Sequence, residues 1–535
     1  MRIARVALLC AVVIAVGVVL VSGEDGGPRT PKALPGLPPP FLGTAVAGEG
    51  GLTAAVDAYG DVVDLRPGPA GKALIDNPAD RQAAGTVAED TGIVPRISIG
   101  GGDGEDSMAM WEAERVTQRY LAGTNVVRTV AMFQGAQVVM TVAASGDSLA
   151  VVMRAQGEGG SIVTPSVGVD VGGGIRCARQ RRAALLDLIC RLGRGVPPVS
   201  GGAAGVVQAA VGEGRGWLFR SNGLGAGAPN WARLMYIRSL LTVHALTSSN
   251  TGAVAAGARD GWAYVWPRDA ATAALALAAS GHRGEARAVA KFLTGLDLGA
   301  AARFGEDGEP IPGRAAQGDA LGWVTAAVRA TDTPAPDQPL PWRDRADYQE
   351  SSPGDYLGNA LAAAAPSVAS EFGTPDGLVR SAGNPGSGLD SAAGWAVRPF
   401  ELSKLYPAAE RTLLRLVEDG TPYGITPGEG WEGGEDPWTA PTAWSAWALA
   451  GLAADAGRTG VRDPRTNLKA GRQRGGPSPR SRHAALELLL DLRRASTPAG
   501  DLPERVGAHT GVPTSTTPLL WSSAFAVLAL RELWP

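Results

Sequence analysis

The chain has few of the side chains from which metal sites and disulfide frameworks are built. Three cysteines in 535 residues are too few for a disulfide scaffold. The four histidines are scattered, and none stands at zinc-like spacing from another histidine or a cysteine. We therefore expect no metal site. Cys177 and Cys190 either pair with each other, if the protein is exported, or remain free thiols.

The sequence also lacks a strong charge of either sign. Its net charge is −3, so nothing draws the whole molecule to nucleic acid or to acidic lipid. The 74 glycines and 39 prolines follow no period, which excludes a collagen-like protein. A charged fraction of 19% is ordinary for a soluble globular protein, and the length predicts two to four domains.

An uninterrupted apolar run is found at the N-terminus, over residues 6–21, after Arg2 and Arg5. A basic start, an apolar run and small residues are typical of an export signal. The run would span roughly 24 Å, which is short for a bilayer of roughly 30 Å. We predict a signal peptide or membrane anchor over 1–26 and a stiff proline-rich spacer over 27–40. The protein would then be exported, either tethered at the outer face of the cytoplasmic membrane or secreted, with membrane contact only through this segment.

Residues 41–221 have the texture of an antiparallel β-sandwich. Short runs rich in valine, glycine and threonine alternate with turns, as in "GLTAAVDAYGDVVDL" and "AQVVMTVAA". One segment of this region, "QRRAALLDLICRL" at 180–192, is predicted to be a helical insert.

Residues 222–535 change to apolar residues at helical spacing, in many segments of similar length. Several of these segments end at glycine. Long loops between them carry much of the tryptophan and acidic content. This pattern predicts a toroid of helical hairpins whose functional residues lie in the loops at one rim.

The stretch "DGWAYVWPRDAATAALALAA" at 260–279 crowds rings and charges at the start of an alanine-rich helix. In the simplest interpretation Pro267 and Asp269 start and cap the helix, and the tryptophans only pack. In a functional interpretation Trp266 stacks on the apolar face of a sugar ring. Arg268 and Asp269 would then bind its paired hydroxyls.

Cleavage of a glycosidic bond needs two carboxylates, one to donate a proton and one to activate the nucleophile. Spacing alone cannot choose them among 52 acidic residues. A resemblance can, because five segments of the helical region, in order, resemble glycoside hydrolase family 15, the glucoamylases with glucodextranase and bacterial trehalase. They lie at 236–293, with the Trp-Pro-Arg-Asp signature, and at 315–328, 347–370, 427–452 and 502–530. "YLAGTNVVRT" at 120–129 resembles the accessory β-sandwich of the same family.

The resemblance implies an N-terminal antiparallel β-sandwich, 41–221, followed by an (α/α)6 catalytic domain, 222–535, without a cofactor. Carried over residue by residue, Glu350 matches the general acid and Glu504 the general base. Arg268 and Asp269 match the pair that grips the non-reducing-end glucose. The pocket aromatics correspond to Trp266, Trp431 and Trp438.

The sequence departs from the family at the acid. Gln349 stands where the family usually has a tryptophan, which puts the catalytic rate in doubt. Glu432 and Glu435 in "GWEGGED" echo the acid motif, but they lie too close to Glu504 in the chain for the family.

The resemblance implies an inverting, exo-acting α-glucoside hydrolase that releases glucose from the non-reducing end of an α-linked oligosaccharide or polysaccharide. The alternative is a catalytically weak or inactive glycan-binding protein of the cell envelope on the same fold. The sequence does not separate α-1,4 glucan, α-1,6 glucan and trehalose as substrates, and it leaves the oligomeric state open.

Overall fold

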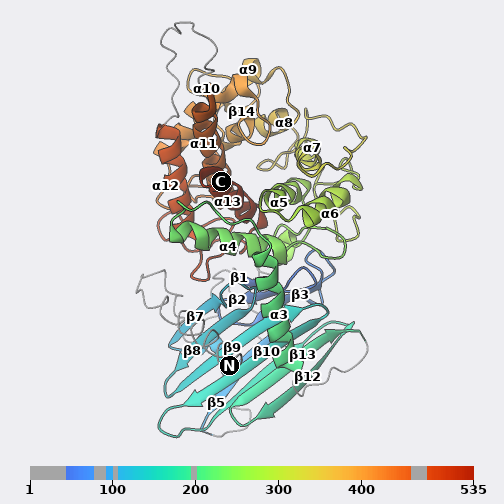
Figure 1. Ribbon diagram of the computed structural model, residues 1–535, viewed down its shortest axis with the longest axis vertical. Coiled ribbons are helices and arrows are strands. Elements are labelled where there is room, and N and C mark those ends of the chain that lie inside the picture. Colours follow the sequence, from blue (N-terminus) through green and yellow to red (C-terminus); the bar gives the residue numbers. More distant parts are fainter. Residues whose placement is uncertain (1–43, 77–91, 101–106, 194–201, 460–478) are drawn as a thin grey trace, which may run out of the picture.

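The protein is described here from a computed structural model, over residues 44–76, 92–100, 107–193, 202–459 and 479–535. A β part and a helical part are stacked end to end along the long axis (Figure 1). This arrangement confirms the predicted multidomain β plus α architecture with antiparallel sheets. None of the helices within these ranges has both the length and the apolar character needed to cross a bilayer. The predicted export segment 1–26 and spacer 27–40 lie outside the described residues.

The β part consists of two antiparallel sheets. The seven-stranded sheet has the order β1-β2-β3-β5-β11, with β4 on β3 and β6 on β5, and the six-stranded sheet has the order β12-β13-β10-β9-β8-β7. The strands are β1 (Thr44–Ala47), β2 (Leu52–Asp57), β3 (Val62–Pro67), β4 (Ile75–Asp76), β5 (Gly92–Ile99), β6 (Met108–Ala109), β7 (Arg115–Tyr120), β8 (Val127–Phe133), β9 (Ala136–Ser145), β10 (Ser148–Gly157), β11 (Val163–Asp170), β12 (Ile175–Arg182) and β13 (Leu185–Leu192).

Alternation along the strands explains how the two sheets share one core. Strand β8 reads Val-Arg-Thr-Val-Ala-Met-Phe, and every second side chain, from Val127 to Phe133, is buried. Leu65 and Ile97 of one sheet and Val142 and Leu149 of the other belong to the same buried cluster. The apolar face of each sheet is therefore covered by the other.

The predicted helical insert at 180–192 is wrong. This segment forms the end of β12, a turn at Ala183, where φ is 49°, and strand β13. Cys177 and Cys190 are direct partners across the two strands and form a disulfide. The leucines of the segment fit a helical period as well as a strand, and an apolar run this short does not separate the two.

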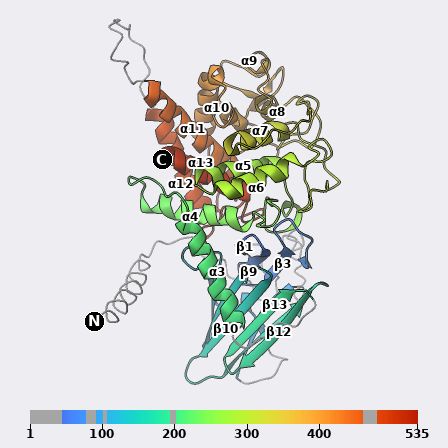
Figure 2. The ribbon, with the colours of Figure 1, turned by 45° about the vertical axis from the view of Figure 1, so that its right-hand side comes forward.

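Helix α3 (Gly202–Phe219) was not predicted, because its five glycines make the sequence look like a loop. It packs on strands β9 and β10 and leads from the six-stranded sheet to the helical part, as both views show (Figures 1 and 2).

The helical segments predicted after residue 222 are helices in the structure. One of them, at 358–373, is broken into two short helices before and after Pro366, as expected for a residue that cannot continue a helix. The helices are α4 (Asn230–Ala245), α5 (Pro267–Ala279), α6 (Arg283–Thr294), α7 (Ala320–Thr331), α8 (Leu357–Ala362), α9 (Val368–Glu371), α10 (Tyr406–Glu418), α11 (Thr439–Thr459), α12 (Pro479–Ala495) and α13 (Leu520–Leu533).

Two kinds of helix alternate in this part. Helices α5 and α13 are buried on nearly all sides and contact each other, whereas α6 and α10 bury one stripe and expose the other. Small side chains in α5, most of them alanine, allow neighbouring helices to approach closely. Inner and outer layers of helices follow from this division, although the complete (α/α)6 toroid and the boundaries at 221/222 stay predictions.

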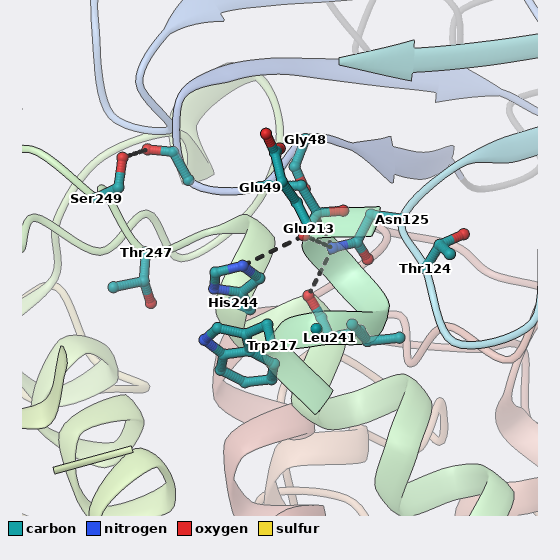
Figure 3. Close-up of polar contacts among 12 residues, drawn as sticks. Gly48, Glu49, Thr124, Asn125, Glu213, Trp217, Leu241, His244, Thr247 and Ser249 are labelled. Atoms are coloured by element: carbon teal, nitrogen blue, oxygen red, sulfur yellow. Dashed lines mark hydrogen bonds and ion pairs between the residues drawn. The ribbon is translucent and has the colours of Figure 1, made fainter. Parts of the chain in front are cut away.

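The two parts are joined by polar contacts as well as by α3. In the close-up, Glu49 of the β1–β2 turn faces His244 of α4, and their side chains form an ion-pair contact of 3.2 Å (Figure 3). The Asn125 amide donates to the carbonyl oxygens of Gly48 and Leu241, at 3.1 and 3.2 Å. The β1–β2 turn, the loop before β8 and helix α4 are therefore fixed to one another.

A stack of three rings lies at this junction. Trp217 of α3 lies between His244, at 4.2 Å between ring centroids, and His282, at 3.7 Å. Its indole N–H donates to the Glu285 carboxylate at 2.8 Å. His282 is buried, and burial, with smaller contributions from His244 and Arg220, lowers its pKa from 6.5 to about 4.

We predict a stability that depends on His282 at mildly acidic pH. Because the unfolded state takes up a proton near pH 6.5 and the folded state only near pH 4, folding stability falls as the pH falls through this window. His282→Gln cannot take up this proton, so its free energy of unfolding, measured by urea denaturation, should depend less steeply on pH between 6.5 and 4. His509→Gln, at an exposed histidine, is the control and should keep the wild-type slope. Equal slopes for wild type and His282→Gln would contradict the prediction.

Candidate active site

One pocket in the helical part collects most of the predicted site residues. Five of the seven line it, namely Trp266, Arg268, Asp269, Trp438 and Glu504. The rest of its wall consists of Ala256, Trp262, Arg314, Tyr348, Ala440, Leu519 and Trp521. Segments almost 250 residues apart in the chain, from Ala256 to Glu504, therefore meet at a single cavity.

The floor of the pocket is the start of helix α5. Pro267 occupies the first turn, as predicted, and Trp266 is the residue that precedes the helix. The Arg268 and Asp269 side chains are almost fully buried, at 5% and 6% exposure. Because both belong to the first turn of a rigid helix, their positions are fixed before any ligand binds.

Arg268 is held by a set of buried acceptors. Its Nη1 donates to Asp319 Oδ2 at 2.7 Å and to Gln317 Oε1 at 2.9 Å, and its Nη2 lies 3.8 Å from Asp269 Oδ2. Its guanidinium carbon also lies 4.5 Å from the ring centroid of Trp521. A charge this deeply buried requires such partners. Its Nε remains buried without a hydrogen-bond partner.

Arg268 and Asp269 together are called the Arg268–Asp269 clamp below, and Asp269 is its acidic member. Burial raises its pKa to about 7; the positive charge of Arg268 opposes this rise, and the carboxylates of Asp319 and Glu504 add to it. Its carboxyl group can therefore either accept or donate a hydrogen bond near neutral pH, which suits recognition of a sugar hydroxyl.

Glu504 lies on the loop between α12 and α13 and is oriented through both carboxylate oxygens. The Trp262 indole N–H donates to Oε1 at 3.2 Å, and the Ser515 hydroxyl donates to Oε2. Burial raises the pKa of Glu504, while these two donors and the nearby Arg505 and Arg314 lower it. The result is an oriented, partly exposed carboxylate at the pocket wall.

The loop that carries Trp262 depends on a close approach at Gly257. A Cβ atom at this position would lie 2.9 Å from Trp262 Cβ and 3.2 Å from Thr516 Oγ1. Any larger residue would push apart the two loops that place Trp262 and Glu504 side by side.

Glu350 is not among the residues that line the pocket, although its neighbour Tyr348 is. The backbone N–H of Glu350 donates to Asp347 Oδ1 at 2.7 Å, and Glu350 is partly exposed. The loop is anchored by Asp347, whose pKa burial raises to about 7, with a smaller contribution from Asp390.

Gln349 takes part in a buried network next to this loop. Its amide donates to the Tyr348 hydroxyl and, at 3.3 Å, to Asp390 Oδ2. The Tyr348 hydroxyl in turn donates to Asp390 Oδ1 at 2.9 Å. Gln349 therefore packs the loop through hydrogen bonds, where a tryptophan would do so by ring contact.

Trp431 also stands outside the pocket lining. Its ring packs edge-on against Trp438, at 5.7 Å between centroids, and so supports a wall residue from behind.

Several residues that line the pocket, and two that support Arg268 beneath it, were not named from the sequence. Trp262 lies in the same ring-rich stretch as Trp266, so its spacing could have identified it. Gln317 and Asp319 lie in a segment that carried the resemblance, but their contact with Arg268 gives no signal in the sequence. Arg314, Tyr348 and Trp521 reach the pocket only through the fold. Within the described residues no group of histidine, cysteine and acidic side chains could hold a metal ion.

Residues 230–298, which include the floor of the pocket, match the family model described as glycosyl hydrolases family 15. No curated protein matches the sequence. Among solved structures, a bacterial glucoamylase complexed with acarbose is similar over 96% of both chains, at 12% identity and a TM-score of 0.55. At this identity the likeness shows a shared fold.

Two fungal structures are similar over part of the chain. The glucoamylase from Saccharomycopsis fibuligera is 15% identical over 58% of this chain and 97% of its own, with a TM-score of 0.44. The Hormoconis resinae glucoamylase is 13% identical over 57% of this chain and 73% of its own, with a TM-score of 0.45. Residues 230–298 therefore resemble glycosyl hydrolases family 15, a family of glycoside hydrolases, and the chain as a whole shares its fold with the bacterial glucoamylase.

Proposed function

We propose that the protein is an inverting, exo-acting α-glucoside hydrolase that releases glucose from the non-reducing end of an α-linked glucan. The observation that carries this proposal is that Glu504, Arg268 and Asp269 line the same pocket. Acarbose in the bacterial glucoamylase of the same fold is consistent with an oligosaccharide ligand.

In this proposal the terminal glucose ring stacks on the aromatic wall. Trp266, Trp438 and Trp521 supply ring surface for its apolar face, while Arg268 and Asp269 bind its outer hydroxyls. In this proposal the buried Arg268 and Asp269 close one end of the pocket, so that the bound ring is the last of its chain. Exo action is proposed on this basis.

Glu504 acts as the general base. Trp262 and Ser515 orient its carboxylate and favour the ionised form, so that it can take a proton from a water molecule. The water attacks the anomeric carbon from the face opposite the leaving oxygen, which inverts the configuration. Glu350, on the loop next to Tyr348, is the proposed general acid that protonates the leaving oxygen.

A glycan-binding protein with weak or no activity is the second candidate. Two observations favour it, namely the absence of Glu350 from the pocket lining and the presence of Gln349 in place of the family's tryptophan. In that case the Arg268–Asp269 clamp would bind a sugar without cleaving it. We further propose that the protein is exported, on the basis of the sequence of residues 1–26.

We predict that replacement of Glu504 and replacement of Glu350 lower the activity on different sets of substrates. Glu504→Gln should lower kcat on α-glucosides by about 10³-fold or more, whatever the leaving group, because no carboxylate remains to activate water. Glu350→Gln should be severely impaired on maltose but much less so on α-glucosyl fluoride, which needs no protonation of its leaving group. Steady-state kinetics on both substrates, with maltose, isomaltose and trehalose as the linkage panel, measure these differences.

The anomer released first, observed by NMR, tests inversion, for which β-glucose is expected. Initial release of the α-anomer would overturn the inverting mechanism. If wild type and Glu504→Gln were equally inert on the whole panel but both bound the sugars, the binding-protein alternative would replace the hydrolase.

We also predict that Ser515 sets the pH dependence of the reaction. Its hydroxyl donates to Glu504 and so lowers the pKa of that carboxyl, which must be ionised to act as a base. In Ser515→Ala the pKa of Glu504 rises, so the acid limb of the kcat/KM profile should move to higher pH. Ser496→Ala, which removes a surface hydroxyl that donates to the Arg493 carbonyl, is the control and should leave the profile in place. An acid limb that does not move in Ser515→Ala would argue against Glu504 as the base.

A further inference from the structure

Two cations line the pocket, and they differ in how their charge is balanced. Arg268 lies 2.7 Å from Asp319 and 3.8 Å from Asp269, so its charge is paired. Arg314 has no carboxylate within ion-pair distance in the part of the chain that the structure describes. It therefore presents an unpaired positive charge to the cavity.

Arg314 lies on the side of the pocket next to the loop of the proposed general acid. Its guanidinium carbon is 5.3 Å from the ring centroid of Trp266, and its Nη2 donates to Ser351 Oγ at 3.1 Å. Ser351 directly follows Glu350 in the chain. Since an acid must stand beside the oxygen that it protonates, the leaving group departs past this arginine.

A second arginine lies beside the first. The backbone contacts Ile311 N–H to Arg303 O, at 2.9 Å, and Ala302 N–H to Arg314 O, at 3.3 Å, hold Arg303 and Arg314 on adjacent segments. The Arg303 guanidinium carbon lies 4.9 Å from the Tyr264 ring centroid, and its Nε is buried without a hydrogen-bond partner.

The two guanidinium groups repel each other. Burial, followed by the charges of Arg268 and Arg303, lowers the pKa of Arg314, and the negative charge of Glu504 opposes this shift only in part. An anion beside Arg314 would reduce the repulsion between the two arginines. It could also accept hydrogen bonds from the guanidinium N–H groups of Arg314, of which one donates to Ser351. A neutral glucan offers no such anion.

We propose that Arg314, with Arg303 beside it, forms a cationic leaving-group subsite that selects α-glucosides whose aglycone carries a carboxylate or phosphate group. This inference rests on the proposed function, because it assigns one side of the same pocket. It adds a class of substrate, namely anionic α-glucosides, to the α-glucans that the clamp alone would accept.

The test compares two leaving groups of similar size and shape, one charged and one neutral. The probes are 4-carboxyphenyl and 4-carbamoylphenyl α-D-glucopyranoside, with a phosphate-bearing aryl glucoside as a third compound to separate the two anions. At low ionic strength the wild type should favour the carboxylate over the amide by about tenfold in kcat/KM, the size expected for a charge-assisted hydrogen bond. Addition of 0.5 M NaCl should shrink this ratio, because salt screens a partly exposed charge.

Arg314→Gln should bring the ratio close to one, and Arg314→Lys should retain part of it because the charge remains but the fork is lost. Arg411→Gln, which removes an exposed arginine from helix α10, is the matched control and should keep the wild-type ratio. A wild type that cleaves the amide at least as fast as the carboxylate, or a ratio that Arg314→Gln does not change, overturns the cationic subsite and leaves the proposed function standing.

Inactivity on every substrate would count against the proposed function instead. Calorimetric binding of the two aryl glucosides to Glu504→Gln then decides the subsite, because tighter binding of the carboxylate supports it and equal binding overturns it.

Discussion

The buried charge of Arg268 is the constraint on which the site depends. A guanidinium at 5% exposure is stable only if carboxylates and amide oxygens surround it, and here Asp319 and Gln317 supply them at 2.7 and 2.9 Å. These contacts tie the first turn of α5 to the residues just before α7. The pocket floor therefore cannot shift without exposing an unpaired buried charge, which makes it rigid in the absence of a ligand.

The same contacts extend from the floor to the walls. The Gln317 side chain, which accepts from Arg268, donates through its amide to the carbonyl oxygen of Asp347. Asp347 in turn accepts from the backbone N–H groups of Gln349 and Glu350. The sugar clamp and the loop of the proposed acid thus belong to one continuous hydrogen-bonded network. A substrate that binds Arg268 is therefore connected through hydrogen bonds to the loop of the proposed acid.

The helical part could be predicted well from the sequence, because its apolar residues recur at helical spacing and proline or glycine marks many ends. The failures lie where that signal is weak. The hairpin at 180–192 has an apolar run that suits either period, and α3 has too many glycines. Within the site, the Trp266–Asp269 motif could be found from the sequence, because its residues are consecutive and lie at the start of one helix. Arg314 and Tyr348 reach the pocket through tertiary packing, which one sequence does not encode locally.

The charge balance of the pocket explains why a cation stands unpaired at its edge. The charges of Asp319 and Glu504 raise the pKa of Asp269, and the charge of Arg268 opposes them. Arg314 contributes to lowering the pKa of Glu504, after the hydrogen bonds from Ser515 and Trp262 and the charge of Arg505. If a carboxylate were paired with Arg314, this effect on Glu504 would be cancelled. An Arg314 without an ion-pair partner therefore favours the ionised form of Glu504. The same positive charge can contact a leaving group on that side of the pocket.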